Sequence, residues 1–196
     1  MEMTALNTLE AIARRRSIRR FQERPIAHDL IEQVLAATVL APSAKNAQPW
    51  RFIVVEQPKR AELIQIMRLK AENLKIETMN LGSLEWTTRV IAQAPVTIFI
   101  LNTCPPPEVP QTAYKDWDFV MLQSTGAAIQ TMLLAAQDLG LGSLWICDVL
   151  YASTEILAWI GHPNDTLVAA VSLGYAAETP PTRSRHPWQK VTEWLA

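Results

Sequence analysis

The sequence predicts an α+β fold in which a central sheet of four or five strands is sandwiched by helices. Several segments carry apolar residues at helical spacing, short apolar runs bounded by proline or glycine are typical of strands, and the two kinds are mixed along the chain. A chain of 196 residues that is 49% hydrophobic can bury one sizeable core. We therefore expect a single domain over residues 1–196.

Two helices are expected before the first strand. The apolar residues at helical spacing in the first helix are Leu6, Leu9, Ile12 and Ala13. This helix should end near Arg14–Arg16, because cations suit the negative pole of a helix. The second helix follows the break at Pro25, has Asp29 as its N-cap or first-turn acid, and ends before Pro42. Its apolar stripe consists of Leu30, Ile31, Val34, Leu35 and Thr38.

The middle of the chain predicts two strands and one long helix. Phe52–Val55 is typical of a buried strand, and residues 59–81 are typical of a long, charged helix. The apolar residues of this helix that could face the body are Leu63, Met67 and Leu74. Val96–Leu101 is nearly all apolar between Pro95 and the run Pro105–Pro107, which indicates a strand covered on both faces.

The C-terminal half predicts a central helix and two further strands. Residues 115–139 are apolar nearly all round, as in a helix packed on several sides, and Gly140 should end that helix. Residues 143–146 and 167–173 are typical of strands, with a helix over residues 154–160 between them.

Composition and charge argue against several functional classes. The formal net charge of -1 opposes a general affinity for nucleic acid or anionic membranes. There is no signal-peptide pattern over Met1–Glu10 and no run of about 18 apolar residues, so we expect a cytoplasmic protein without a membrane span. Cys104 and Cys147 lie far apart, so neither a disulfide framework nor a thiolate metal site is expected. The three histidines are equally scattered, so they are not expected to form a metal site either; they are His28, His162 and His186.

Two groups of arginines, one near each end of the chain, suit a phosphate. Arg15-Arg16-Ser17-Ile18-Arg19 places guanidinium forks and a hydroxyl just past a helix end. Arginine supplies planar, bidentate and permanently charged donors that match phosphate oxygens. Thr182-Arg183-Ser184-Arg185 adds a second pair after the last strand. The two groups could close on one phosphate if the first helix and the tail are neighbours; the alternative is a solvated basic surface.

A polar loop and a glycine pair complete the motifs. Pro42-Ser43-Ala44-Lys45-Asn46-Ala47-Gln48-Pro49-Trp50 is rich in side-chain amides, which could read the edge of a heteroaromatic ring. A plain helix-to-strand connection would use the same residues. Gly140-Leu141-Gly142-Ser143 precedes a strand and lacks a third glycine. We therefore reject a dinucleotide fingerprint there and expect a helix cap and a close backbone approach.

The tail from Glu178 onward is polar and rich in proline, yet it carries Trp188, Trp194 and Leu195. A free extension would not usefully expose that apolar surface. We therefore expect residues 178–196 to pack on a partner subunit.

Taken in this order, the motifs resemble those of the nitroreductase family of FMN enzymes, over nearly the whole chain. The resemblance is strongest in residues 15–19, 41–50 and 173–175, with support from residues 126–146. It implies a mixed, mostly antiparallel sheet and an intertwined homodimer that holds FMN at its interface. NADH or NADPH would pass hydride to flavin N5, and a nitroaromatic, quinone or related small-molecule acceptor would then receive it, with ping-pong kinetics.

The resemblance also assigns cofactor-binding residues, whereas flavin N5 carries the chemistry without a catalytic side chain or a metal. The FMN phosphate, ribityl chain and pyrimidine side would be held by Arg15, Arg16, Ser17 and Arg19, with Arg183 and Arg185 completing the phosphate site. The residues that would come from the other subunit are Pro42, Ser43, Ala44 and Asn46. Backbone amides near Ile146 and Cys147 would lie at flavin N5.

The chain departs from the family pattern at two places. Cys147 stands where many members have glycine, and it could fill space under the flavin or act as a thiol near N5. The polar residue that often reads the pyrimidine before the Pro95 strand is not clearly matched, although Thr87 or Arg89 could substitute. The loop Thr103–Gln111 could cover the flavin.

Two other functions remain open: a flavin enzyme of dehalogenating or flavin-fragmenting chemistry, and an FMN-binding protein without turnover.

Overall fold

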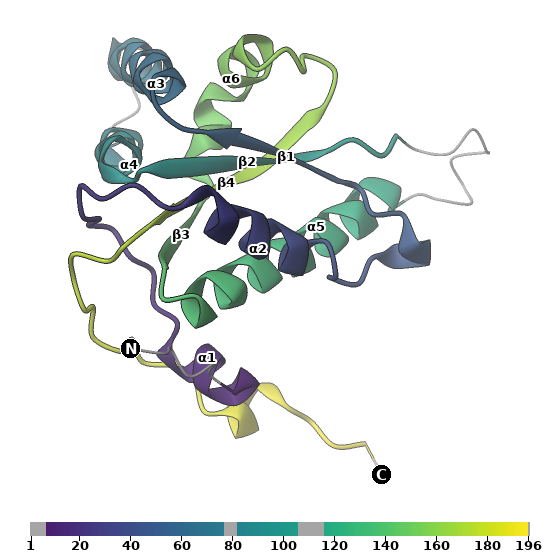
Figure 1. The fold of residues 1–196 in the computed structure, drawn as a ribbon. Helices are drawn as coiled ribbons and strands as arrows, with labels where there is room; N and C mark the ends of the chain where they lie inside the picture. The colour runs from purple at the N-terminus through teal and green to yellow at the C-terminus, as the bar shows by residue number, and fades with distance from the viewer. Residues whose placement is uncertain (1–6, 77–81, 106–115, 196) are drawn as a thin grey trace.

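A computed structural model describes residues 7–76, 82–105 and 116–195 of the chain (Figure 1). The helices and strands in chain order are α1 (Thr8–Arg14), α2 (His28–Thr38), β1 (Trp50–Val55), α3 (Lys59–Ile76), α4 (Gly82–Gln93), β2 (Val96–Asn102), α5 (Trp117–Asp138), β3 (Gly142–Ile146), α6 (Ser153–Trp159) and β4 (Thr166–Gly174). Three short 3-10 helices are η1 (Ala44–Asn46), η3 (Asp148–Ala152) and η4 (Trp188–Val191).

The sheet has four strands in the order β1-β2-β4-β3, and each of its three pairings is antiparallel. In the register, Phe52 lies opposite Ile100, and Ile98 lies opposite Val171. The expected α+β class and strand number are confirmed. The expectation of a buried first strand is wrong: β1 is an edge strand in which only Val55 is fully buried.

Helices cover both faces of the sheet, so alternate residues of β2 enter two separate apolar clusters. Phe99 and Leu101 pack with residues of α3, α4 and α6, whereas Ile98 and Ile100 pack with residues of α2 and α5. Figure 1 shows α3, α4 and α6 on one side of the sheet and α2 and α5 on the other. This arrangement confirms the sandwich and explains why every residue of β2 is buried.

The central helix α5 agrees with the sequence expectation. It is long and apolar enough to cross a membrane by length and composition alone. Its buried residues, Met132 and Ile129 among them, pack against the sheet and α2, so α5 is a helix of the core. Its end is a Schellman motif: Gly140 has a φ of 72°, and the Leu141 amide donates to the Ala136 carbonyl at 2.8 Å. The predicted cap at Gly140 is confirmed.

One helix was missing from the sequence prediction. The helix expected over residues 59–81 is described only to Ile76, as α3, and a separate helix α4 follows from Gly82. The apolar spacing from Leu84 to Ile91 is helical, but threonines occupy the buried positions between them. Thr88 is tolerated there because its hydroxyl donates to the Leu84 carbonyl at 2.7 Å. Because threonines stand at buried positions where apolar side chains are usual, the helical periodicity of this segment is weak in the sequence.

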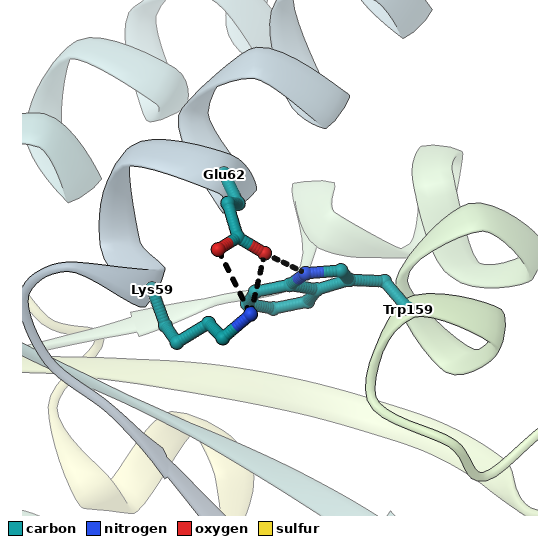
Figure 2. A network of polar contacts seen from close by, with 3 residues as sticks. All are labelled: Lys59, Glu62 and Trp159. Carbon is teal, nitrogen blue, oxygen red and sulfur yellow. Dashed lines mark hydrogen bonds and ion pairs between the residues drawn. The ribbon is translucent and has the colours of Figure 1, made fainter.

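Polar contacts join α3 to α6 on the surface (Figure 2). The carboxylate of Glu62 accepts hydrogen bonds from Lys59 Nζ, at 2.8 and 2.9 Å, and from Trp159 Nε1, at 2.9 Å. These bonds, that from Lys59 first, hold the pKa of Glu62 below its ordinary value. The network thus joins α6 to α3 more strongly while Glu62 is ionised, because hydrogen bonds to an ionised acceptor are the stronger ones.

Candidate functional site

The chain that follows α1 runs between β3 and the segment after β4. Ser17 forms a parallel bridge with Ser143, and the Ile18 amide donates to the Ser143 carbonyl at 2.9 Å. A few residues later, Phe21 forms an antiparallel bridge with Ala176. Residues 17–21 therefore cover the free edge of β3, which fixes the N-terminal arginines to the sheet.

Two glycines make this close approach possible. A Cβ atom at Gly142 would lie 2.9 Å from Ile18 Cγ1, and one at Gly174 would lie 2.7 Å from Phe21 Cδ1. Both distances are shorter than non-bonded carbon atoms tolerate. The close backbone approach predicted around Gly142 is confirmed, and the partner in that approach is the segment that carries the arginines.

The tail is held to the same segment by a carboxylate. Glu178 accepts hydrogen bonds from the backbone amides of Arg19, at 2.6 Å, and Arg20, at 3.2 Å. Hydrogen bonds to an ionised acceptor are stronger than neutral ones. Glu178 therefore fixes the start of the tail beside the first arginine group.

Both arginine groups line one cavity of about 660 Å³, at the end of the molecule where α1 and the tail lie side by side (Figure 1). The cavity is lined by Ile12, Ala13, Arg15, Arg16, Ser17, Arg19, Gln130, Pro180, Pro181, Thr182, Arg183 and Arg185. The first helix and the tail are therefore neighbours in the fold, which is the condition for the two arginine groups to share one phosphate. The six predicted residues that it brings together come from positions 15–19 and 183–185.

The guanidinium groups in this cavity repel one another. The pKa of Arg15 lies below its ordinary value, first because of burial, then because of the charge of Arg185 and then that of Arg16. Both charges that act on Arg15 are positive. An anion placed in the cavity would relieve this repulsion, and a phosphate offers oxygens that match several guanidinium forks at once. The donors present thus fit a phosphate group.

Arg16 also has a structural role, because its guanidinium forms hydrogen bonds with other groups of the protein. Nη1 donates to the carbonyls of Ala13, at 2.7 Å, and Arg15, at 2.9 Å, and Nη2 donates to Thr182 Oγ1. These bonds tie the C-terminal end of α1 to the tail. Arg16 therefore positions its neighbours as well as lining the cavity.

Neither α4 side chain considered as a pyrimidine reader lines the arginine cavity. The hydroxyl of Thr87 is buried and donates to Asp148 Oδ2 at 2.8 Å. Arg89 lines a separate cavity between α3 and α4. The α4 residue beside the arginines is Trp86, whose ring centroid lies 5.5 Å from Arg19 Cζ. A search for polar readers misses an aromatic residue of this kind.

The residues expected near flavin N5 lie at the far end of β3. Ile146 is buried at the end of that strand, and Cys147 follows it with an exposed, free thiol. Gly142, at the start of the strand, contacts the arginine segment, and Ile146 lies about 13 Å from Gly142 along the strand. Within this chain Cys147 fills no buried space. Residues 106–111 of the loop considered as a cover lie outside the described residues.

The polar loop, residues 42–50, lies beside α5 and does not line the arginine cavity of its own chain. The Ala44 amide donates to Ser124 Oγ at 3.1 Å, and Ser43 Oγ accepts from the Gln48 amide at 3.0 Å. Three residues here, Lys45, Asn46 and Gln48, have φ between 47° and 54°. Left-handed backbone is strained for such residues and concentrates at functional sites. The expected role of Pro42, Ser43, Ala44 and Asn46 in another subunit's site stays a prediction.

A larger cavity of about 830 Å³ lies beside residues 21–26 and β1. Arg24 and Arg60 line it together with Glu23 and Glu56, so its charges balance. The arginine cavity, although smaller, is the better candidate site because its charge is of one sign. In the described part of the chain, no group of three or more His, Cys, Asp and Glu side chains could hold a metal ion.

Comparisons with known proteins agree with this fold. The model of the Nitroreductase family matches residues 12–175. A protein of Archaeoglobus fulgidus, provisionally named NADH dehydrogenase/NAD(P)H nitroreductase, is 34% identical over 173 residues, which cover 85% of this chain and 84% of that one. The 5,6-dimethylbenzimidazole synthase of Rhodobacter capsulatus is 29% identical over 204 residues, covering 98% and 97% of the two chains. A nitroreductase of Desulfitobacterium hafniense, solved with bound FMN, superposes with a TM-score of 0.75 at 25% identity, covering 98% of this chain and 100% of that one.

Proposed function

Because this chain belongs to the nitroreductase family, we propose that it is an FMN-dependent oxidoreductase that uses NADH or NADPH to reduce a nitroaromatic, quinone or related small molecule. The observation that carries the proposal is the single cavity in which arginines from both ends of the chain converge. A phosphate is the ligand that best suits those donors, and FMN is what the similar Desulfitobacterium hafniense protein holds.

The protein's own residues bind and orient the cofactor in this proposal. Arg15, Arg183 and Arg185 hold the phosphate, and the Ser17 hydroxyl offers a short donor beside them. Arg19 places a positive charge where it would stabilise electron density added to the ring. When bound, FMN supplies the two-electron chemistry, accepting hydride from NAD(P)H and passing it to the acceptor.

We further propose a cytoplasmic homodimer in which each chain contributes to its partner's site. The support is apolar surface gathered on α1 and on the tail. Leu9 is 78% exposed and Trp194 is 83% exposed, and Trp188 is also exposed. Apolar groups gathered in this way mark an interaction surface. In such a dimer, residues 42–46 would approach the partner's flavin.

A flavin-fragmenting reaction is the second candidate, and one observation favours it. The Rhodobacter capsulatus synthase aligns with this chain over nearly the full length of both. The two reactions differ in what happens to the cofactor, because acceptor reduction regenerates FMN whereas fragmentation consumes it.

The visible spectrum of the purified protein tests the proposal. Bound FMN should bleach on anaerobic addition of NADH or NADPH, and its full absorbance should return when a quinone or a nitroaromatic is added. Absorbance that does not return after aerobic reoxidation would favour fragmentation. Flavin that does not bleach would favour a binding protein without turnover. A colourless protein that takes up no FMN would refute the whole assignment.

A further inference from the structure

Neighbouring residues of α4 face different surroundings. Trp86 lies beside Arg19, Thr87 is buried against Asp148, and Arg89 lines the separate cavity next to α3. Of these three residues, the one that contacts an arginine of the cavity is therefore aromatic. A tryptophan face attracts a guanidinium when the two lie within about 6 Å, and the observed distance is 5.5 Å.

Both the backbone and the side chain of Arg19 have contacts within the chain. Its backbone amide donates to Glu178 at 2.6 Å, and its Nη1 donates to the Ser17 carbonyl at 3.0 Å. Trp86 supplies the third constraint, because Arg19 Cζ lies over its ring. The side chain is only partly buried, so without Trp86 the guanidinium would keep one hydrogen bond as its restraint.

Helix α4, which carries Trp86, is fixed through the neighbouring Thr87. The bond from Thr87 to Asp148 joins α4 to η3, which begins directly after β3 and Cys147. β3 also carries the bridge from Ser143 to Ser17. Helix α4 is therefore bonded to the residues directly after β3, and the arginine segment is bonded to β3 itself.

We propose that Trp86 is a positioning residue for Arg19, holding its guanidinium in the cavity in place of a polar α4 side chain that would read the flavin directly. The proposal rests on the proposed FMN function. A charge held in one orientation beside the ring favours the reduced flavin more than the oxidised one, because the reduced ring carries more electron density.

The test compares Trp86→Leu with wild type and with Arg89→Ala, a control on the same helix outside the arginine cavity. Fluorescence titration of the apoprotein should give an FMN Kd about two- to fivefold weaker in Trp86→Leu and unchanged in Arg89→Ala. Affinity for reduced FMN should fall about threefold further, which lowers the two-electron potential by about 14 mV. Trp86→Phe, which keeps an aromatic face, should recover most of both losses.

A double-mutant cycle separates positioning from direct contact. In an Arg19→Met background, Trp86→Leu should have no further effect on FMN affinity or potential, because the group that it positions is gone. An additive loss in that background, or a dimer that dissociates in Trp86→Leu on sizing chromatography, would overturn the inference. So would a Trp86→Leu protein that matches wild type. If wild type itself takes up no FMN, the proposed function fails and this inference falls with it.

Discussion

Arg185→Gln should weaken FMN binding without weakening the fold. In the free protein, Arg185 acts on Arg15 only as a like charge that lowers the pKa of Arg15. Its own guanidinium donates to the carbonyl of Ser184 at 3.0 Å, a local bond within the tail. Removing this charge therefore costs the free protein little, and the melting temperature of the apoprotein should stay the same or rise slightly.

The loss of affinity follows from one charge-assisted hydrogen bond to the phosphate. Such a bond contributes about 1.5–3 kcal/mol, which corresponds to about 10- to 150-fold in Kd. Arg185 is exposed, so solvent screens it and the lower end, about tenfold, is expected. Riboflavin has the same ring without the phosphate, so its affinity should not change.

The assay is the quenching of flavin fluorescence on titration with apoprotein, with FMN and riboflavin measured in parallel. Wild type should prefer FMN, and Arg185→Gln should reduce that preference about tenfold. Arg51→Gln removes the same charge from an exposed arginine of β1 that does not line the cavity, and it should change neither affinity. An equal loss for FMN and riboflavin in Arg185→Gln would refute the phosphate assignment.

Three further perturbations test other parts of the structure. Gly142→Ala should destabilise the fold by about 1–3 kcal/mol in chemical denaturation, since its Cβ would press on Ile18; a neutral substitution would contradict the close approach. Glu62→Gln should flatten the acid limb of the stability profile: the pKa of Glu62 is lowered by folding, so its contribution is complete above the ordinary value of 4.5 and is lost as pH falls through the folded pKa. An acid limb identical to that of wild type would mean that the network in Figure 2 contributes nothing. Deletion of residues 187–196 should weaken the proposed dimer, and an unchanged elution volume on sizing would remove the tail from the interface.

The fold could be predicted where the apolar pattern was strong. Residues 96–101 and 115–139 are apolar enough to identify a strand and a helix buried on several sides, and both predictions are confirmed as β2 and α5. The pattern failed where burial was mixed. The apolar run before Val55 belongs to an edge strand, and threonines interrupt the apolar face of α4.

The candidate site was only partly predictable, because its chemistry is local and its assembly is not. Each arginine group was visible as a cluster of phosphate-binding donors. That residues 15–19 meet residues 183–185 depends on bridges such as Phe21 to Ala176, between residues far apart in the chain. The glycine at 142 predicts a close approach, but no local pattern identifies the segment that makes it. The pairing of Arg19 with Trp86 escaped for the same reason.

The structure also explains how like charges are kept together before a ligand arrives. Three kinds of contact hold the arginine segment and the tail in place: the backbone bridges, the Glu178 carboxylate on two amides, and the bond from Arg16 to Thr182. None of these bonds uses the charge of Arg15 or Arg185. These contacts order the two backbone segments that carry the donors, so an arriving phosphate need not supply the free energy of bringing the segments together. The same logic predicts that Thr182→Val, which removes the acceptor that ties Arg16 to the tail, should weaken FMN binding but leave riboflavin binding unchanged; equal weakening of both would place the role of Thr182 at the ring and not at the phosphate.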